Sequence, residues 1–183
     1  MLNLIAKIRL FFLNRAINKD VRKLKRNVQI FNLSQAKSIG VVYNASTEND
    51  FGRAAGLIRH LQAQDKYVKS IGIAPYKVKP HYLPTKLSYD FITLEELNWY
   101  RKPQGKFVDE FINYEFDVLI DLNLKGDNSL RYVTSLSKAK FKIGLFNEEH
   151  QDIYDFMLEG IEAGKVSLFI KELLHYLEIF NSK

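Results

Sequence analysis

Two polar segments of this chain carry residue types from which a small-ligand site could be built. Backbone N–H groups at a helix start near Thr47, together with the helix dipole, would hold a small anion, and Lys125 would add positive charge. The first segment contains Asn44, Ser46, Thr47, Asn49, Asp50 and Gly52, and the second contains Asp121, Asn123, Lys125, Gly126, Asp127 and Asn128. The predicted ligand-binding residues are Asn44, Ser46, Thr47, Asn49, Asn123 and Lys125.

Each segment also holds a carboxylate that could do chemistry. Asp50 and Asp121 could act as an acid–base pair or hold a divalent cation. The same residue types serve as caps and turns at this place in related folds, and Asp121 at a strand end could cap the next helix. Both interpretations stay open here, with the structural one favoured.

Several kinds of site are disfavoured by what the sequence lacks. There is no cysteine, and none of the glycine-rich dinucleotide, P-loop or nucleophile-elbow patterns occurs. The four histidines have no spacing suited to a metal site. We therefore expect no cofactor and no metal. Whether the protein is an enzyme stays open, and a protein without catalytic activity is favoured.

The elements that must position these segments follow from the hydrophobic pattern. Continuous apolar runs predict buried strands of a parallel sheet, and they alternate with helical patterns. Strands are expected at 38–43, 68–74, 89–93, 116–121 and 141–145, with a possible sixth at 153–158. Helices are expected at 51–64, 107–112, 128–137 and 166–180, with a helical turn or two at 94–100.

This alternation predicts a single Rossmann-like, doubly wound α/β domain with a mainly parallel sheet of five or six strands. We expect the strand order 3-2-1-4-5. The order then reverses between the strands at 38–43 and 116–121, which would bring the two polar segments together at the carboxyl edge of the sheet.

The N-terminal region differs in character from the rest of the chain. Apolar residues recur at steps of three and four through residues 3–31, which predicts one long amphipathic helix, with a bend allowed near Asn18. Residues 1–31 carry eight basic residues and one acidic residue, a net charge of +7, whereas the remainder sums to −1. We divide the chain into a basic helix, 1–33, and an α/β domain, 34–183. Candidate phosphate or partner contacts are Lys19, Arg22, Lys23, Lys25 and Arg26.

Three roles for this helix compete. Its apolar face could pack on the domain or on a protein partner, including a second copy of the chain. The helix could instead lie on an anionic membrane surface. It could also dock on RNA, with the basic cluster contacting phosphates.

Size and composition set the general class. The chain has 183 residues, of which 46% are hydrophobic, enough for one well-packed domain. The N-terminus does not read as a secretory signal, because Lys7 and Arg9 interrupt its apolar run. No apolar stretch is long enough to span a bilayer. We expect a cytoplasmic protein, with peripheral membrane association as an option.

The segment from Phe116 to Phe146 resembles a known family. Phe-Asp-Val-Leu-Ile-Asp-Leu-Asn, then Ser-Leu-Arg, then Ser-Lys-Ala-Lys-Phe-Lys-Ile-Gly-Leu-Phe is similar to the N-terminal Rossmann-like domain of heptosyltransferase-like glycosyltransferases. The likeness covers about residues 38–147. By this resemblance Asp50 would be the loose counterpart of the family's catalytic acid, although the order here is Asn49-Asp50-Phe51-Gly52 rather than a Gly-Asp pair.

Such enzymes have a second domain that binds the sugar nucleotide, and this chain contains only a counterpart of the first. It also resembles an uncharacterised family of short single-domain bacterial α/β proteins, which implies no activity. We therefore predict a non-catalytic binding or adaptor domain attached through its basic helix. The alternatives are a small enzyme or sensor with a polar-anion or sugar-type site, and an RNA- or ribosome-associated factor.

Overall fold

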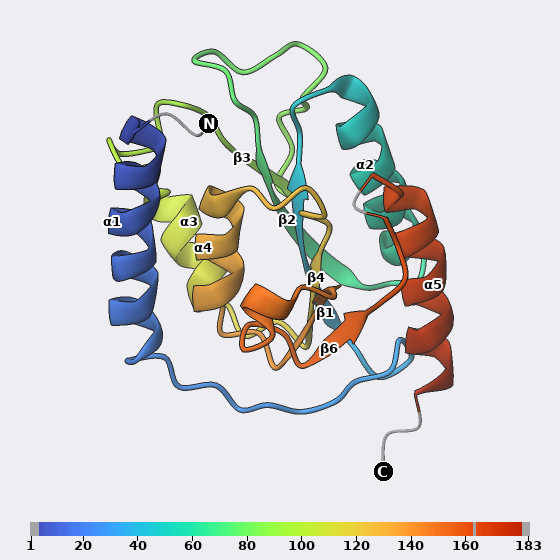
Figure 1. The fold of residues 1–183 in the computed structure, drawn as a ribbon. Coiled ribbons are helices and arrows are strands. Elements are labelled where there is room, and N and C mark those ends of the chain that lie inside the picture. The colour runs from blue at the N-terminus through green and yellow to red at the C-terminus, as the bar shows by residue number, and fades with distance from the viewer. Residues whose placement is uncertain (1–3, 163, 181–183) are drawn as a thin grey trace.

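A computed structural model describes residues 4–162 and 164–180 and shows one six-stranded sheet with helices on both faces (Figure 1). The elements are α1 (Leu4–Val21), β1 (Ser38–Asn44), α2 (Glu48–Gln62), β2 (Tyr67–Ile73), β3 (Tyr89–Ile92), α3 (Lys106–Asn113), β4 (Val118–Asp121), α4 (Asn128–Leu136), β5 (Phe141–Leu145), a 3₁₀ turn η1 (Glu148–His150), β6 (Phe156–Leu158) and α5 (Val166–Ile179).

The sheet has the predicted topology. Its order is β3-β2-β1-β4-β5-β6, and every neighbouring pair is parallel. The order 3-2-1-4-5 is confirmed, with β6 added at the edge next to β5. The α/β Rossmann-like fold class is therefore confirmed.

Burial explains why the strands are continuous apolar runs. All four residues of β4 are buried, and so are the five central residues of β1. Both strands lie in the middle of the sheet and are covered by helices on both faces. Gly40 in β1 allows a close approach, because a Cβ there would lie 2.7 Å from Leu119 and 2.8 Å from Phe116.

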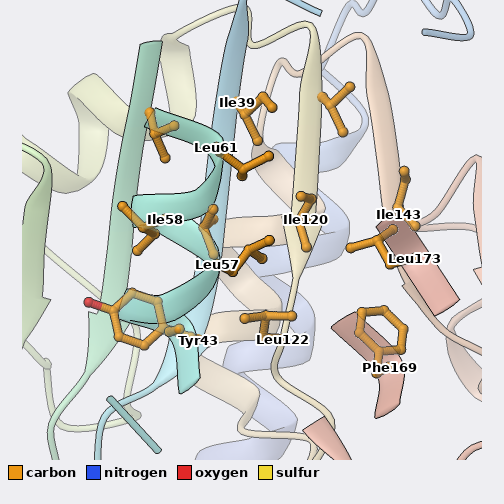
Figure 2. Close-up of a cluster of buried hydrophobic side chains, with 14 of the residues drawn as sticks. Ile39, Tyr43, Leu57, Ile58, Leu61, Ile120, Leu122, Ile143, Phe169 and Leu173 are labelled. Atoms are coloured by element: carbon orange, nitrogen blue, oxygen red, sulfur yellow. The ribbon is translucent and has the colours of Figure 1, made fainter. Parts of the chain in front are cut away.

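The two faces of the sheet carry separate hydrophobic cores. On one face α2 and α5 pack over β1, β4 and β5, as Figure 2 shows for Ile39, Ile120, Ile143, Leu57, Phe169 and Leu173. On the other face α3 and α4 pack over the sheet. A third, smaller cluster joins α1 to the outside of α4, through Leu13, Ile17, Tyr132 and Leu136. The helix α1 is thus an outer layer next to α4 (Figure 1).

The N-terminal helix is shorter than the sequence pattern predicts. The expectation of one helix over 3–31 is wrong, because α1 ends at Val21 and residues 22–37 form a connector without helix or strand; residue 3 lies outside the described residues. The connector passes along one edge of the sheet from α1 toward α5 (Figure 1).

Tertiary contacts hold the connector in this path. Arg26 Nε donates to the Ala139 carbonyl at 2.8 Å, and the N–H of Leu33 donates to the Leu177 carbonyl at 2.8 Å. Phe31 and Leu33 are buried in the core beneath α5, whereas Val28 is 56% exposed. Helix propensity is a weak preference, and these contacts override it.

A short helix expected over 94–100 is also absent. That segment forms turns stabilised by the Asn98 side chain, which accepts hydrogen bonds from the N–H groups of Tyr100 and Lys102. Leu97 packs against the core on the α3 and α4 side of the sheet, whereas Trp99 is exposed and contacts Phe12.

Candidate functional site

The two polar segments meet at the switch point of the sheet. The strand order reverses between β1 and β4, and the segment after each strand carries the residues predicted to bind a ligand. Lys125 Nζ lies 3.4 Å from Asp50 Oδ2, which joins the two segments. The expected meeting of the segments at this edge is therefore observed.

Within these segments most predicted residues stabilise the backbone. Thr47 caps α2 by accepting a hydrogen bond from the Asp50 N–H at 3.1 Å. Asn44 accepts from the Ser46 N–H, and Asn123 both donates to and accepts from the Asp127 backbone. The remaining ligand candidate, Asn49, is exposed.

The space between the two segments is small. The cavity lined by Asn44, Asp50 and Lys125 has a volume of about 10 Å³, because Leu122, Leu124 and other apolar side chains fill the switch point. Such a space holds about one water molecule. A ligand there would require the two segments to separate, and binding at this position stays a prediction.

The two candidate carboxylates lie in different surroundings. Asp50 accepts from the Thr47 hydroxyl at 2.9 Å and forms ion pairs with Arg53 and Lys125. Asp121 is 2% exposed and lines a separate cavity on the α4 side of the sheet. The structure places them against different partners, and a catalytic role for either stays a prediction.

Asp121 is held by three hydrogen bonds. Its carboxylate accepts from the Asn123 N–H at 2.7 Å and from the hydroxyls of Thr134 and Tyr154 at 2.8 Å each. Burial raises the pKa of Asp121, and these hydrogen bonds oppose the rise. Burial beside Asp121 also raises the pKa of Tyr154 well above its usual value.

A larger cavity lies between α1, α4 and the β5–β6 connection. We call this space the polar cleft. It has a volume of about 550 Å³, and a second part of about 320 Å³ extends to Asp121 and Tyr154. These volumes fall within the roughly 300–1,000 Å³ typical of small-molecule sites. Both parts share the wall residues Leu10, Asn128, Arg131, Glu149 and His150.

The cationic side chains of Lys142 and Arg131 line the polar cleft. Lys142 is 1% exposed and donates to the carbonyls of Thr134 and Ser135 at 2.7 and 3.0 Å, near the end of α4. Burial, together with the nearby Arg26, lowers the pKa of Lys142 to about 7. Arg131 is half-buried and hydrogen-bonds to Asn14 of α1 and to His150.

A second candidate surface is the outward side of α1, opposite Leu13 and Ile17. We call it the outer face; its apolar side chains are Leu4, Ile8, Phe11 and Phe12, exposed by 71%, 42%, 61% and 40%. Phe12 packs against Phe11 at 5.5 Å between ring centroids and against the 57% exposed Trp99 at 5.0 Å. The apolar residues of α1 thus lie on two sides of the helix, of which one packs on α4 and the other is open to solvent.

Basic residues accompany the outer face. Residues 4–19 contain no acidic side chain, and the exposed basic side chains of this stretch are Lys7, Arg9, Arg15 and Lys19. Asp20 turns toward the body, where it contacts Lys102 Nζ at 3.3 Å and accepts from the Tyr132 hydroxyl.

The predicted phosphate-contacting cluster is divided by the end of α1. Lys19 lies on the helix, and Arg22, Lys23 and Lys25 are exposed at its end and on the connector. Arg26 turns inward and pairs with Asp155 at 2.5 Å. Arg26 is therefore engaged in holding the connector, and the other four stay available to a partner.

Comparison with known proteins places the chain in a family. The model of a family of unknown function, DUF6913, matches residues 9–180, from within α1 to the end of α5. The chain belongs to that family. The resemblance to heptosyltransferase-like domains stays a prediction.

A comparison with curated proteins found no match. Among solved structures, the chain is similar to an exopolyphosphatase-related protein from Bacteroides fragilis, with 19% identity and a TM-score of 0.46. The match covers 79% of this chain and 41% of that one, so this chain spans less than half of the other's length.

The sequence analysis named Asp121, Asn123, Asn128 and Arg26, which line parts of the polar cleft, but it missed most of the other cleft residues. The ones that matter most are Asn14, Asn18, Arg131, Ser135, Lys142, His150 and Tyr154. One signal was present in the sequence. Lys142 lies within the buried run Phe-Lys-Ile-Gly-Leu of β5, where a charged residue is rare and requires hydrogen-bonding or charged partners. The other residues come from α1, α4 and the β5–β6 connection, and only the fold brings them together.

Proposed function

We propose that this protein is an adaptor that attaches to an anionic membrane surface through the outer face of α1. The observation that carries the proposal is the exposure of Leu4, Ile8 and Phe11 on a helix whose other side is already packed against α4. Exposed apolar patches of this kind mark contact surfaces.

The charge pattern favours a lipid surface as the partner. The basic residues Lys7, Arg9, Arg15 and Lys19 accompany the apolar side chains, and each basic residue near an anionic membrane contributes about 1 kcal/mol. Aromatic side chains such as Phe11 and Trp99 bury their rings at the boundary between headgroups and acyl chains. No helix in the described parts of the chain is long and apolar enough to cross a membrane. The proposed contact therefore lies along the surface.

Two other partners fit the outer face less well. A second copy of the chain would bring two sets of like charges together, which opposes pairing through this face. RNA would engage the basic residues but would leave Leu4 and Phe11 in water, because phosphates and sugars make no use of such side chains.

A vesicle-binding assay tests the proposal. We expect the protein to sediment with vesicles that contain phosphatidylserine and much less with pure phosphatidylcholine, with binding that weakens as salt rises. Replacing Phe11 by alanine should weaken binding by at least about tenfold, since burying such a side chain contributes roughly 1.5–3 kcal/mol. Leu4→Ala should weaken it by a smaller factor.

Matched controls separate this contact from general stickiness. Leu87→Ala removes a leucine that is 98% exposed in the β2–β3 connection, and this variant should bind vesicles like the wild type. The proposal is wrong if Phe11→Ala also binds like the wild type. It is equally wrong if Phe11→Ala instead abolishes a dimer seen by analytical ultracentrifugation, or if RNA is bound and vesicles are not.

A further inference from the structure

The polar cleft contains buried hydrogen-bonding groups that the protein itself leaves unsatisfied. Within the described chain, Arg131 Nε and Ser135 Oγ are both buried and have no hydrogen-bond partner. Ser135 is 6% exposed, and both residues line the part of the cleft nearest α1. Buried polar atoms in native proteins nearly always have a partner, so two such atoms on one cavity wall indicate that a bound molecule completes them.

Arg131 also forms no ion pair within the described chain, although the charges of Glu149 and Asp152 lie near enough to act on it. Its guanidinium hydrogen-bonds to the side chains of Asn14 and His150. The other two cations at the cleft are already engaged, Arg26 by Asp155 and Lys142 by two carbonyl groups. A half-buried arginine that forms no ion pair is suited to bind the carboxylate or phosphate of a ligand.

The rest of the cleft wall offers neutral hydrogen-bonding groups. Asn18 and Asn128 line it, and neither side chain hydrogen-bonds to another described residue. Amide side chains donate and accept at once, which matches the hydroxyl groups of a polyol. Leu10, Ile17 and Ile153 supply apolar wall against which carbon atoms can pack.

Acidic residues limit the total charge of a ligand. Glu149 and Asp152 also line the cleft, and both are exposed. They would repel an extended polyanion such as a nucleic acid, whereas a molecule with one anionic group can place it at Arg131 and direct its neutral part elsewhere.

We propose that the polar cleft binds a small polyhydroxylated compound with one anionic group, either a sugar acid or a sugar phosphate. Arg131 binds the anionic group, and Ser135, Asn18 and Asn128 bind hydroxyls. The site is separate from the outer face of α1, and it does not depend on membrane attachment.

Ligand titrations followed by ¹H–¹⁵N NMR test this proposal in the absence of vesicles. The probes are a panel of aldonic and uronic acids, a panel of pentose and hexose phosphates, neutral glucose, and inorganic phosphate. We expect at least one anionic sugar to shift the backbone signals of Arg131, Ser135 and His150 with a dissociation constant of about 1 mM or lower. Which panel binds decides between carboxylate and phosphate.

Three outcomes would overturn the proposal. One is that no anionic sugar binds at concentrations up to about 10 mM. Another is that inorganic phosphate binds as tightly as the sugar phosphates while the sugar acids do not bind. The third is that the shifted signals lie outside the cleft, for example at the switch point near Lys125.

Variants then assign the roles of the two unsatisfied groups. Arg131→Gln should weaken binding by roughly 20-fold or more, because a charge-assisted hydrogen bond is lost. Ser135→Ala should weaken it by roughly three- to tenfold. The matched control is Arg59→Gln, an exposed arginine of α2 on the opposite face of the sheet, which should bind like the wild type.

Circular dichroism and thermal unfolding establish that each variant is folded. If Arg131→Gln does not fold, Ser135→Ala and the wild-type NMR map still decide the matter. Wild-type affinity in a folded Arg131→Gln variant would contradict the proposal.

Discussion

At the scale of single residues, the most informative side chain is Lys142. It stands in a buried strand, yet its ammonium group reaches two carbonyls at the end of α4 and the wall of the polar cleft. Burial removes water from the ammonium group and disfavours its charged form, whereas the two carbonyl acceptors favour that form. The balance places its pKa at about 7, and its charge therefore changes near neutral pH.

The pH dependence of stability follows from this pKa. The unfolded chain has an ordinary lysine pKa, so between pH 7 and about 10 the unfolded state binds a proton that the folded state lacks. The free energy of unfolding should therefore rise with pH through this window, by up to about 1.4 kcal/mol per pH unit from this group. It should be lower below pH 7, where folding requires a buried charge.

Urea denaturation of wild type and Lys142→Met at several pH values between 7 and 9.5 measures this effect. The rise with pH should be smaller in Lys142→Met by the contribution of this group. Lys171→Met, at an exposed position on α5, should keep the wild-type slope. Equal slopes for wild type and Lys142→Met would show that Lys142 keeps its proton in the folded protein throughout this range.

At the scale of elements, the connector shows how packing overrides a helical pattern. Apolar residues continue to recur every three or four positions at Leu24, Val28 and Phe31. If the helix continued, Val28 would be buried together with Leu24 and Phe31. Instead Phe31 and Leu33 enter the core, two residues apart, and Val28 is exposed. The connector thereby links α1 on one face of the sheet to the core beneath α5 on the other.

Two alanine variants distinguish the observed connector from a continued helix. Leu33→Ala should lower the free energy of unfolding by about 2–4 kcal/mol, because it leaves a cavity in the core. Val28→Ala should change it by less than about 0.5 kcal/mol. A continued helix predicts a large loss for Val28→Ala, so chemical denaturation of the two variants decides between the arrangements.

At the scale of the whole molecule, α1 is a separate outer layer with a limited attachment. A cluster of four buried residues and a few polar contacts join it to α4, whereas the sheet is covered by two larger cores. The same helix provides one wall of the polar cleft and carries the proposed membrane-binding face. Both proposals therefore depend on how firmly α1 is held.

Hydrogen exchange should reveal this difference in stability. We expect amides of α1 to exchange faster than those of β1 and β4, because segments with few buried contacts open at lower free energy. A sugar acid or sugar phosphate bound in the cleft should slow exchange in α1 and leave β1 unchanged. If α1 proves as protected as β1, mass spectrometry of exchanged peptides would show that α1 belongs to the main cooperative unit.

The sequence by itself determined the fold class, the positions of the first five strands and the capping of α2 near Thr47. These depend on local signals, namely continuous apolar runs, alternating periodicities and capping residues, which keep their meaning in any tertiary context. The reversal of strand order is the usual arrangement of doubly wound sheets, and it places the carboxyl ends of β1 and β4 next to each other. The meeting of the two polar segments was predicted from that arrangement, whereas the contact between Asp50 and Lys125 was seen only in the structure.

Only the tertiary structure decided where α1 ends, which of its sides is buried and where the large cavity lies. A helix with apolar residues on two sides gives no sign in its sequence of which side will pack. The contacts of Arg26 and Leu33 that end the helical pattern lie more than 100 residues away along the chain. The polar cleft needs Asn14, Arg131 and Lys142 together, and their proximity depends on how α1, α4 and β5 pack against one another.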